Sequence, residues 1–359
     1  MRAEPDAGPP AEAAPKPGAM PLWVLALSTT LGMQTVASFL DQSLPIIAPL
    51  LTAGAGIAPE RIGNISSLNS LGTVLFLLFG GPILARFGPI RMLQAGALMA
   101  VCGLAVASTG WWPTLIGAAL VMGAGYGPSP PAGSRILAAT APPRHRTLIF
   151  SIKQAGAPFG GALAGLILAP AAAHWGWPAA LAVAMAIGLG AAALIAPARQ
   201  RLDIEREPER PIGPRELFDP RKVAAPFALL RGNPVLLSIT GLAFSFAVVQ
   251  GSLFSFSVTY LATDRHMALA TAGFAYAAMQ FSGVFARILL GWLGSKPAEG
   301  GYVIGARILT AYYFAHFLII LPLLGLLEKT KPLPQSIYDS VLKHPTSAGG
   351  KLEGEPVTA

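Results

Sequence analysis

The chain of 359 residues is 53% hydrophobic and 12% charged, and its mean hydropathy is +0.58. Such a low charged fraction is too small for the surface of a water-soluble protein of this length. The composition therefore predicts a polytopic membrane protein. The net charge of +8 does not indicate nucleic-acid binding, because the basic residues form short clusters between apolar runs and no aromatic residues are interleaved with them. The single cysteine, Cys102, excludes an intrachain disulfide framework.

The first half of the chain predicts a bundle of membrane helices. Residues 1–19 are rich in Pro, Ala and Gly and predict a disordered N-terminal tail. Each of the apolar runs that follow is long enough to cross about 30 Å of hydrocarbon. The predicted spans are residues 20–51, 62–84, 92–110, 112–140, 149–170 and 178–197. Together they predict a six-helix bundle over residues 20–197.

The basic residues predict the orientation of this bundle. Arginines occupy the turns at 86–91 and 142–146, whereas the links at 108–113 and 171–178 have no Lys or Arg. The positive-inside rule therefore predicts a cytoplasmic N-terminus, with both arginine turns on the same side. Four tryptophans in the opposite loops are typical of an interfacial aromatic belt, namely Trp111, Trp112, Trp175 and Trp177.

The second half of the chain is less regular. Residues 198–233 hold much of the remaining charge and predict a cytoplasmic linker with a short amphipathic helix. Apolar runs then predict spans at about 234–262, 268–293 and 301–327, followed by a disordered tail over 335–359. The expected fold is thus all-α, with about nine transmembrane helices.

A glycine-bracketed, arginine-rich turn follows the second run. Gly81 and Gly88 are expected to let the backbone reverse, and Arg86 and Arg91 to anchor the turn among anionic headgroups. This turn resembles the loop between the second and third helices of the major facilitator superfamily, whose pattern is Gly-x-Leu-Ala-Asp-Arg-x-Gly-x-Arg. Ala85 stands where that family usually has Asp. The resemblance thus extends to the loop pattern but not to the charge relay in which that Asp takes part.

The resemblance to this family carries functional expectations. A six-helix bundle, a charged inner loop and further spans is also the layout of the family. It implies a secondary transporter in the bacterial inner membrane that moves a small solute by alternating access and is driven by protons. The expected partners are the solute, protons and the lipid bilayer, and neither enzymatic activity nor a cofactor is expected. The sequence identifies no particular solute and no oligomeric state.

The resemblance changes near the end of the eighth predicted span. The strings Leu-Gly-Trp-Leu-Gly at 290–294 and Glu-Lys-Thr-Lys-Pro-Leu-Pro at 328–334 resemble the last helix and tail of bacterial cytochrome b. We therefore expect a chimera: the first two helices of a facilitator's second half, over 234–289, joined within 289–293 to a cytochrome b-like segment over 290–334. Two alternatives remain, a fusion that transports nothing and an electron-transfer subunit related to cytochrome b. The second lacks paired haem ligands of its own, because only His316 lies within a predicted span.

Polar residues on otherwise apolar runs are candidates for a substrate or proton pathway. They are Gln34, Asp41, Arg135, Lys153, Gln154, Gln250 and Gln280, together with Tyr260 and Arg287. A charge near the membrane centre costs about 2.5–3.5 kcal/mol on insertion scales and usually faces a cavity. Asp41 is thus either a proton or substrate site or, if Pro45 ends its helix, a residue of the outer interface.

The other candidates also have two interpretations. Lys153 and Gln154 could meet an anionic substrate, or Lys153 could snorkel to the inner interface, and Arg135 allows the same alternatives. Each remaining polar group could form an interhelical hydrogen bond instead. The small residues of 155–165 predict close helix packing, and Pro158 within them predicts a bend.

Overall fold

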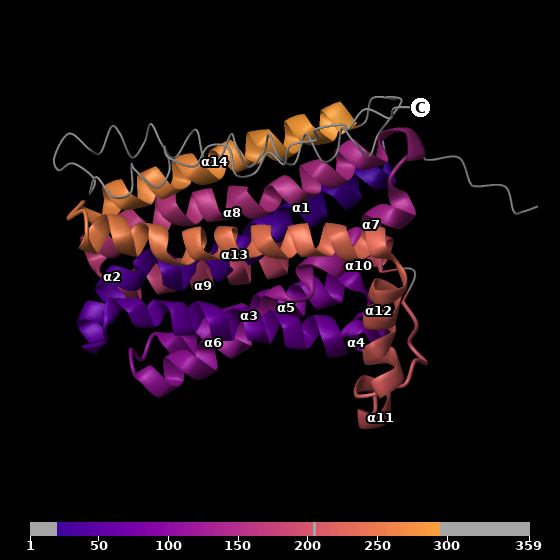
Figure 1. The fold of residues 1–359 in the computed structure, drawn as a ribbon, viewed down its shortest axis with the longest axis horizontal. Coiled ribbons are helices and arrows are strands. Elements are labelled where there is room, and N and C mark those ends of the chain that lie inside the picture. Colours follow the sequence, from indigo (N-terminus) through magenta and orange to yellow (C-terminus); the bar gives the residue numbers. More distant parts are fainter. Residues whose placement is uncertain (1–19, 204–205, 295–359) are drawn as a thin grey trace, which may run out of the picture. The chain divides into compact units, whose positions relative to one another are not determined.

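The computed structural model describes residues 20–203 and 206–294 (Figure 1). The chain divides into two units, Met1–Gly301 and Tyr302–Ala359, and all described residues belong to the first. Every regular element in these residues is a helix, which confirms the all-α fold class. The span predicted at 301–327, His316 and nearly all of the cytochrome b-like segment lie outside the described residues.

The first apolar run forms two helices, α1 (Leu22–Asp41) and α2 (Ser43–Ala55). Pro45 has no backbone N–H to donate to the carbonyl of Asp41 four residues earlier, which weakens the regular α-helix at this point. The chain breaks at Gln42 and resumes within one residue. The two helices together form one candidate span, Leu22–Ala55, and Asp41 lies near its middle rather than at its outer end.

The arginine-rich turn contains a helix of its own. α3 (Ile62–Phe79) is followed by α4 (Gly81–Phe87) and then by α5 (Pro89–Ala107). Gly88 has a φ of 90°, a backbone conformation that favours glycine, and it reverses the chain as predicted. The expected reversal at Gly81 is wrong, because this residue begins α4 and a Cβ on it would meet nothing within 4 Å.

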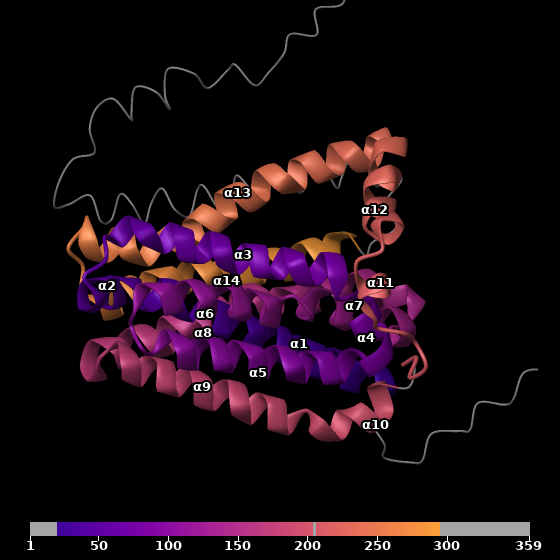
Figure 2. The ribbon, with the colours of Figure 1, turned by 90° about the horizontal axis from the view of Figure 1, so that it is seen from below.

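The fourth predicted span, 112–140, is not one helix. It consists of α6 (Trp112–Tyr126) and α7 (Ser129–Thr140), which are separated at Gly127 and Pro128. Three prolines between residues 128 and 131 lack the N–H groups that a continuous helix needs, so the run breaks there. Figure 1 and Figure 2 show α6 and α7 following one another along the bundle.

α8 (Arg146–Trp175) lies between two other helices, and glycine makes both contacts possible. Gly156 and Gly160 face α1, where a Cβ on Gly156 would come within 2.9 Å of the carbonyl oxygen of Leu31. Gly165 faces α14, where a Cβ would come within 2.5 Å of the carbonyl oxygen of Gly273. The predicted close packing of residues 155–165 is therefore confirmed. Pro158 lies inside α8.

The bundle continues with α9 (Trp177–Leu194), and the linker contains three short helices. They are α10 (Arg199–Leu202), α11 (Pro214–Leu217) and α12 (Pro220–Gly232), the last of which coincides with the predicted linker helix. Figure 1 and Figure 2 place α10, α11 and α12 at the same end as α4 and α7, which we call the linker end. Single turns of 3-10 helix occur at Pro59–Arg61, Pro143–His145 and Ala196–Ala198.

Two long helices follow the linker, α13 (Pro234–Thr263) and α14 (Leu269–Gly294). α14 packs along α8, whereas α13 contacts mainly α2 and α14 and exposes most of its first half. Among the described residues, seven helical segments are long and apolar enough to cross a membrane. The broken pair α6 and α7 accounts for one further crossing. In lipid no water is available to the backbone, and an α-helix satisfies its N–H and C=O groups within a single segment, which explains why these apolar runs are helical.

Candidate functional site

The described residues enclose a cavity of about 500 Å³ between the α1–α9 bundle and the two helices after the linker. Its walls come from α1, α3, α8, α13 and α14. Polar residues repeat at helical spacing on two of these walls, so that α1 and α3 each present a polar stripe to the cavity. On α1 and the break after it the stripe consists of Gln34, Ser38, Asp41 and Gln42, and on α3 of Ser66, Asn69, Ser70 and Thr73.

Asp41 is the carboxylate of this cavity. As the last residue of α1 it is half-buried, and Asn69 Nδ2 donates a hydrogen bond of 2.7 Å to its Oδ1. Gln42 Nε2 donates a second bond, of 3.0 Å, to its Oδ2. The structure therefore places Asp41 at the break between α1 and α2, within one candidate span and against the cavity.

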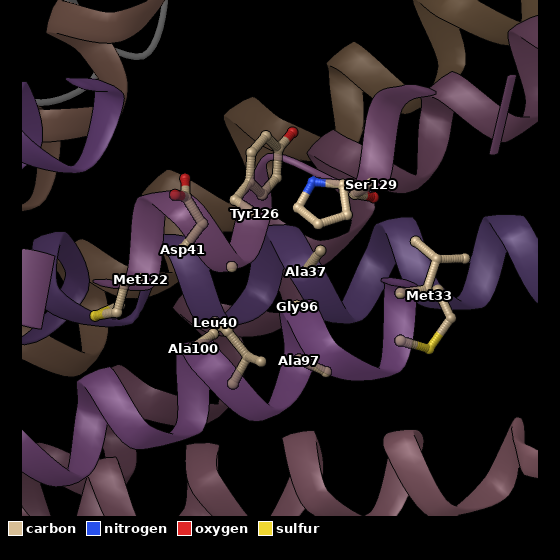
Figure 3. Close-up of a pocket in the computed structure, with 13 residues that line it drawn as sticks. Met33, Ala37, Leu40, Asp41, Gly96, Ala97, Ala100, Met122, Tyr126 and Ser129 are labelled. Carbon is tan, nitrogen blue, oxygen red and sulfur yellow. The ribbon is translucent and has the colours of Figure 1, made fainter. Parts of the chain in front are cut away.

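A smaller pocket lies on the other side of Asp41. Its volume of about 10 Å³ is the size of one water molecule, and Met33, Leu40 and Met122 supply much of its apolar lining. Figure 3 shows the Asp41 carboxylate and the Tyr126 hydroxyl pointing to the same side, away from Leu40. The polar ends of both residues are thus directed toward the large cavity, which they also line.

A hydrogen-bonded chain connects the Asp41 region to α14. Tyr276 Oη donates to Gln42 Oε1 at 2.8 Å and accepts from Gln280 Nε2 at 3.2 Å. All three side chains are buried, and Gln42 in turn donates to Asp41. Hydrogen bonds thus connect the Asp41 carboxylate to α14 through Gln42 and Tyr276.

Gln34 forms a second polar connection, within the bundle. Its Nε2 donates to Tyr126 Oη at 3.1 Å, and its Oε1 accepts from Ser129 Oγ at 3.1 Å. Both ends of the Gln34 amide are thus used to join α1 to the ends of α6 and α7. This is the interhelical hydrogen bond that the sequence left as one of the two interpretations for Gln34.

Two cations lie at another part of the wall, on either side of Gln154. Lys153 Nζ is 3.5 Å from Gln154 Oε1 and 3.5 Å from the Pro130 carbonyl oxygen. Arg287 Nη1 donates to the Gln154 carbonyl oxygen at 3.0 Å. Lys153 is only 1% exposed, so the snorkelling interpretation is wrong for this residue. Gln154 and Arg287 line the cavity, and Lys153 lies behind Gln154.

The remaining candidates divide between the cavity and other places. Gln250 and Gln280 line the cavity. Arg135 does not, because its guanidinium forms an ion pair of 3.6 Å with Glu207 of the linker. Tyr260 is 40% exposed and does not line the cavity either. The structure thus brings together Gln34, Asp41, Gln154, Gln250, Gln280 and Arg287, with Lys153 directly behind them.

The arginine-rich turn lies apart from the cavity, where the linker returns to the bundle. Arg86 Nη1 donates to the Arg210 carbonyl oxygen at 3.0 Å. This side chain therefore binds the linker, whereas the sequence predicted that it would bind lipid headgroups. Arg91 lines a polar pocket of about 480 Å³ together with Arg199 and Arg206. The buried Ala85 accepts a backbone bond of 2.9 Å from Glu207 through its carbonyl oxygen.

Asp203 supplies a carboxylate at this turn. It accepts hydrogen bonds from the backbone N–H groups of Ile90, at 2.6 Å, and Arg91, at 3.3 Å, and thereby caps the N-terminus of α5. A Cβ on Gly88 would come within 2.7 Å of the Asp203 carboxyl carbon, so glycine is needed here for space as well as for its φ. Burial raises the pKa of the Asp203 carboxyl, although the two backbone bonds act in the opposite direction.

Several of these residues were missing from the sequence-based candidates. They include Gln42, Asn69 and Tyr126. Gln42 lies eight positions after the predicted Gln34, a spacing that places both on one face of a helix, and Asn69 shares a polar stripe with Ser66, Ser70 and Thr73. Tyr276 lies four residues before Gln280, on the same face of α14, and offers a similar signal. Asp203 offers none, because its partners are backbone groups more than 100 positions away in sequence.

The described residues contain no group of three or more His, Cys, Asp and Glu that could hold a metal ion. Of their three histidines, two lie far apart on the same helix. His145 and His174 lie at the two ends of α8, a separation of roughly 43 Å along the helix at 1.5 Å per residue. One haem cannot bridge that distance.

Comparisons with known proteins find two kinds of similarity. The Major Facilitator Superfamily profile matches residues 23–330. Separately, cytochrome b/c1 of Bradyrhizobium diazoefficiens is 50% identical over 76 residues, or 21% of this chain and 10% of that protein. Cytochrome b of Rhodospirillum rubrum is 56% identical over 54 residues, or 15% and 13%, and that of Rhodobacter capsulatus 44% identical over 57 residues, or 16% and 13%. The chain therefore spans only about a tenth of the length of these curated relatives. The expected chimeric character is confirmed, and the profile extends past the predicted junction at 289–293.

Proposed function

Because the chain belongs to the Major Facilitator Superfamily, whose profile covers residues 23–330, we propose that its cavity is the solute site of a secondary transporter that works by alternating access. The observation that carries this proposal is the position of the cavity. The α1–α9 bundle supplies one side of it, and α13 and α14 supply the other. Substrate sites of such transporters lie near the membrane midplane between the two halves, where relative movement of the halves exposes them to either side in turn.

Asp41 is the proposed proton-coupling group. It adjoins a break between two helices within one span, and such breaks are where secondary transporters bind substrates and coupling ions. Two neutral amides hold its oxygens, so the carboxyl can gain or lose a proton while no ion pair has to break. The bond from Tyr276 to Gln42 then offers a path from this proton to α14.

The proposed orientation has the linker end in the cytoplasm of a bacterial inner membrane. The arginines of α4, the start of α5, the start of α8 and the linker all lie toward that end. The positive-inside rule favours this placement, and it puts the N-terminus on the same side. We propose no electron transfer for the chain, since only one of its five histidines, His316, lies within a predicted span, whereas a haem of the cytochrome b kind needs paired histidine ligands.

Purified protein in proteoliposomes tests the proposal. A panel of radiolabelled sugars, carboxylates, amides and amines is first assayed for exchange across the membrane and then for accumulation driven by an imposed pH gradient. Asp41→Asn should abolish accumulation while exchange continues, because the variant still binds solute but cannot carry the proton. Asp264→Asn removes a carboxyl in the exposed turn after α13 and is the matched control, with accumulation unchanged.

Three results would contradict the proposal. Gradient-driven accumulation by Asp41→Asn at the wild-type rate would remove Asp41 from coupling. A folded wild-type protein that exchanges no solute of any class would support the non-transporting fusion instead. A b-type haem spectrum in the purified protein would favour the electron-transfer alternative.

A further inference from the structure

The wall of the cavity at Gln154 concentrates positive charge. Lys153 and Gln154 are consecutive residues of α8, and Arg287 comes from α14, the helix that packs along it. Arg287 binds the Gln154 main chain and Lys153 approaches its side chain, so a single residue is in contact with both cations. This wall is built from both sides of the cavity, and its arrangement requires α8 and α14 to be in contact.

These cations are not neutralised by nearby acids. Among the described residues, no carboxylate oxygen lies within 4.0 Å of either the Lys153 ammonium or the Arg287 guanidinium. The two contacts of Lys153 are both at 3.5 Å, longer than the roughly 2.7–3.2 Å that is usual for an N–H···O hydrogen bond. Charge that is removed from water costs free energy unless an opposite charge or strong hydrogen bonds compensate for it. An anion at this wall would supply that compensation.

Arg287 has the geometry to bind such an anion. A guanidinium carries five N–H donors in a planar fork, and the Gln154 carbonyl occupies one of them on Nη1. That bond fixes the side chain, while the donors that remain are matched to a carboxylate with its two oxygens. The side chain lines the cavity, and a solute there can reach it directly.

The α3 wall has the opposite character. Next to the Asp41 carboxylate of α1, it presents the neutral polar side chains of Ser66, Asn69, Ser70 and Thr73 to the cavity. Their hydroxyl and amide groups can form hydrogen bonds with a hydroxyl or amine on the far end of a solute.

We propose that the solute is a small organic anion whose carboxylate binds Arg287, with the charge of Lys153 behind it and with its other end directed to Asn69 and Ser66. This rests on the proposed function and names the chemical class that the site takes. The charged residues nearest the cavity are two cations and one acid, so the site favours an anion over a cation of the same size. Its volume of about 500 Å³ lies within the range of small-molecule sites.

The test measures exchange in proteoliposomes with three matched series of probes. Lactate, succinate and benzoate carry carboxylates, their amides are neutral analogues of similar shape, and benzylamine is the cationic analogue. The wild type should exchange at least one carboxylate and discriminate at least about tenfold against its amide, the loss expected when a charged hydrogen bond cannot form. Exchange of amides or benzylamine in preference to every carboxylate would overturn the inference but leave the transporter itself standing.

Variants then assign the role of each cation. Arg287→Gln should weaken the apparent affinity for the carboxylate about tenfold or more, and Arg287→Lys should retain part of it, because a lysine keeps the charge but not the fork. Lys153→Met, which fills the same space without charge, should weaken it less than Arg287→Gln. Arg221→Gln, on the exposed linker, is the matched control.

Size-exclusion profiles in detergent show whether each variant is folded, and the discrimination by the wild type remains a test if one is not. Carboxylate exchange that is unchanged in a folded Arg287→Gln would overturn the inference. Exchange of no solute by the wild type would count against the proposed function as a whole.

Discussion

α13 and α14 follow one another along the chain, and both are long apolar helices, yet they relate to the bundle in different ways. α14 lies along α8 so closely that a Cβ on Gly273 would come within 2.6 Å of the Gly165 carbonyl oxygen. α13 carries Gly241 and Gly251, and a Cβ on either would meet nothing within 4 Å. Phe244, on the same helix, is 70% exposed.

The difference shows what holds membrane helices together. Lipid tails are as apolar as leucine side chains, so an apolar helix gains little by leaving lipid for another apolar helix. Association depends instead on close backbone approach and on buried polar contacts. α14 has both, through Gly273 and through the Tyr276–Gln42 hydrogen bond, whereas the first half of α13 has neither.

The same substitution on each helix should separate these two situations most clearly. Gly273→Ala places a methyl group against the Gly165 backbone and the Ala169 side chain, and it should lower the free energy of unfolding by about 1–3 kcal/mol, as overpacking usually does. Gly241→Ala adds the same methyl group in open space and should be neutral or stabilise the helix by up to about 1 kcal/mol. Chemical denaturation in detergent micelles measures both.

Equal effects of the two alanines would break the comparison. A destabilising Gly241→Ala would mean that α13 has a close neighbour in the membrane, and a neutral Gly273→Ala would mean that α8 and α14 can separate at no cost.

A smaller effect is expected from the buried tyrosine. Tyr276→Phe removes the hydroxyl that bridges Gln42 and Gln280 and leaves two buried amides each short of one partner, which should cost roughly 1 kcal/mol. Tyr260→Phe makes the same change on α13, where the ring is 40% exposed, and should cost nothing measurable. Denaturation of both variants beside the wild type is the measurement. A loss confined to Tyr260→Phe would reverse the assignment of the two helices.

The smallest effect on stability is expected where the linker attaches to the bundle. The same variant tests whether α13 is held in place by the linker or by its own packing. Asp203→Asn keeps an acceptor at the N-terminus of α5 and should change stability near neutral pH by only a few tenths of a kcal/mol. Because burial raises the pKa of Asp203, the folded protein holds this proton more tightly than the unfolded chain does. The contribution of Asp203 to stability is then fully present below the unfolded pKa and is lost as the pH rises through the folded pKa.

Thermal unfolding between about pH 4 and pH 8 measures this dependence, since the range spans the titration of a carboxyl with a raised pKa. Asp203→Asn should flatten the curve relative to the wild type, and Asp219→Asn, which alters the cap of α12, should leave it unchanged. A curve that steepens in Asp203→Asn would contradict the raised pKa. If the variant also increased proteolysis within α13 but not α14, the linker would be what holds α13.

Local patterns in the sequence predicted some features of the molecule and missed others. Apolar runs and the glycines of α8 are visible in short windows, and so is Gly88, which reverses the chain as expected. The break in the 112–140 run was also visible, in the prolines at 128, 130 and 131, but the overall hydrophobicity of the run concealed it. The position of Asp41 was ambiguous because Pro45 interrupts the helix without ending the span.

Other parts of the site depend on contacts that no local pattern contains. The hydrogen bond from Tyr276 to Gln42 joins residues 234 positions apart. Arg135, a predicted cavity residue, forms an ion pair with Glu207 of the linker and does not line the cavity. Lys153 was misjudged for the same reason. A lysine near a helix end usually snorkels, but here α7 covers it, and a Cβ on Gly133 would come within 2.6 Å of its Cε.

The glycines of α8 also have a consequence for how this protein can vary during evolution. Gly156 and Gly165 meet main-chain atoms of different neighbours, so no compensating side-chain substitution on α1 or α14 can make room for a larger residue at either position. Leu166 and Ile167, on the same helix, are each 37% exposed, and exchange among apolar residues is tolerated there. We therefore expect glycine to be retained where α8 faces α1 and where it faces α14, and the exposed positions of α8 to vary among apolar residues.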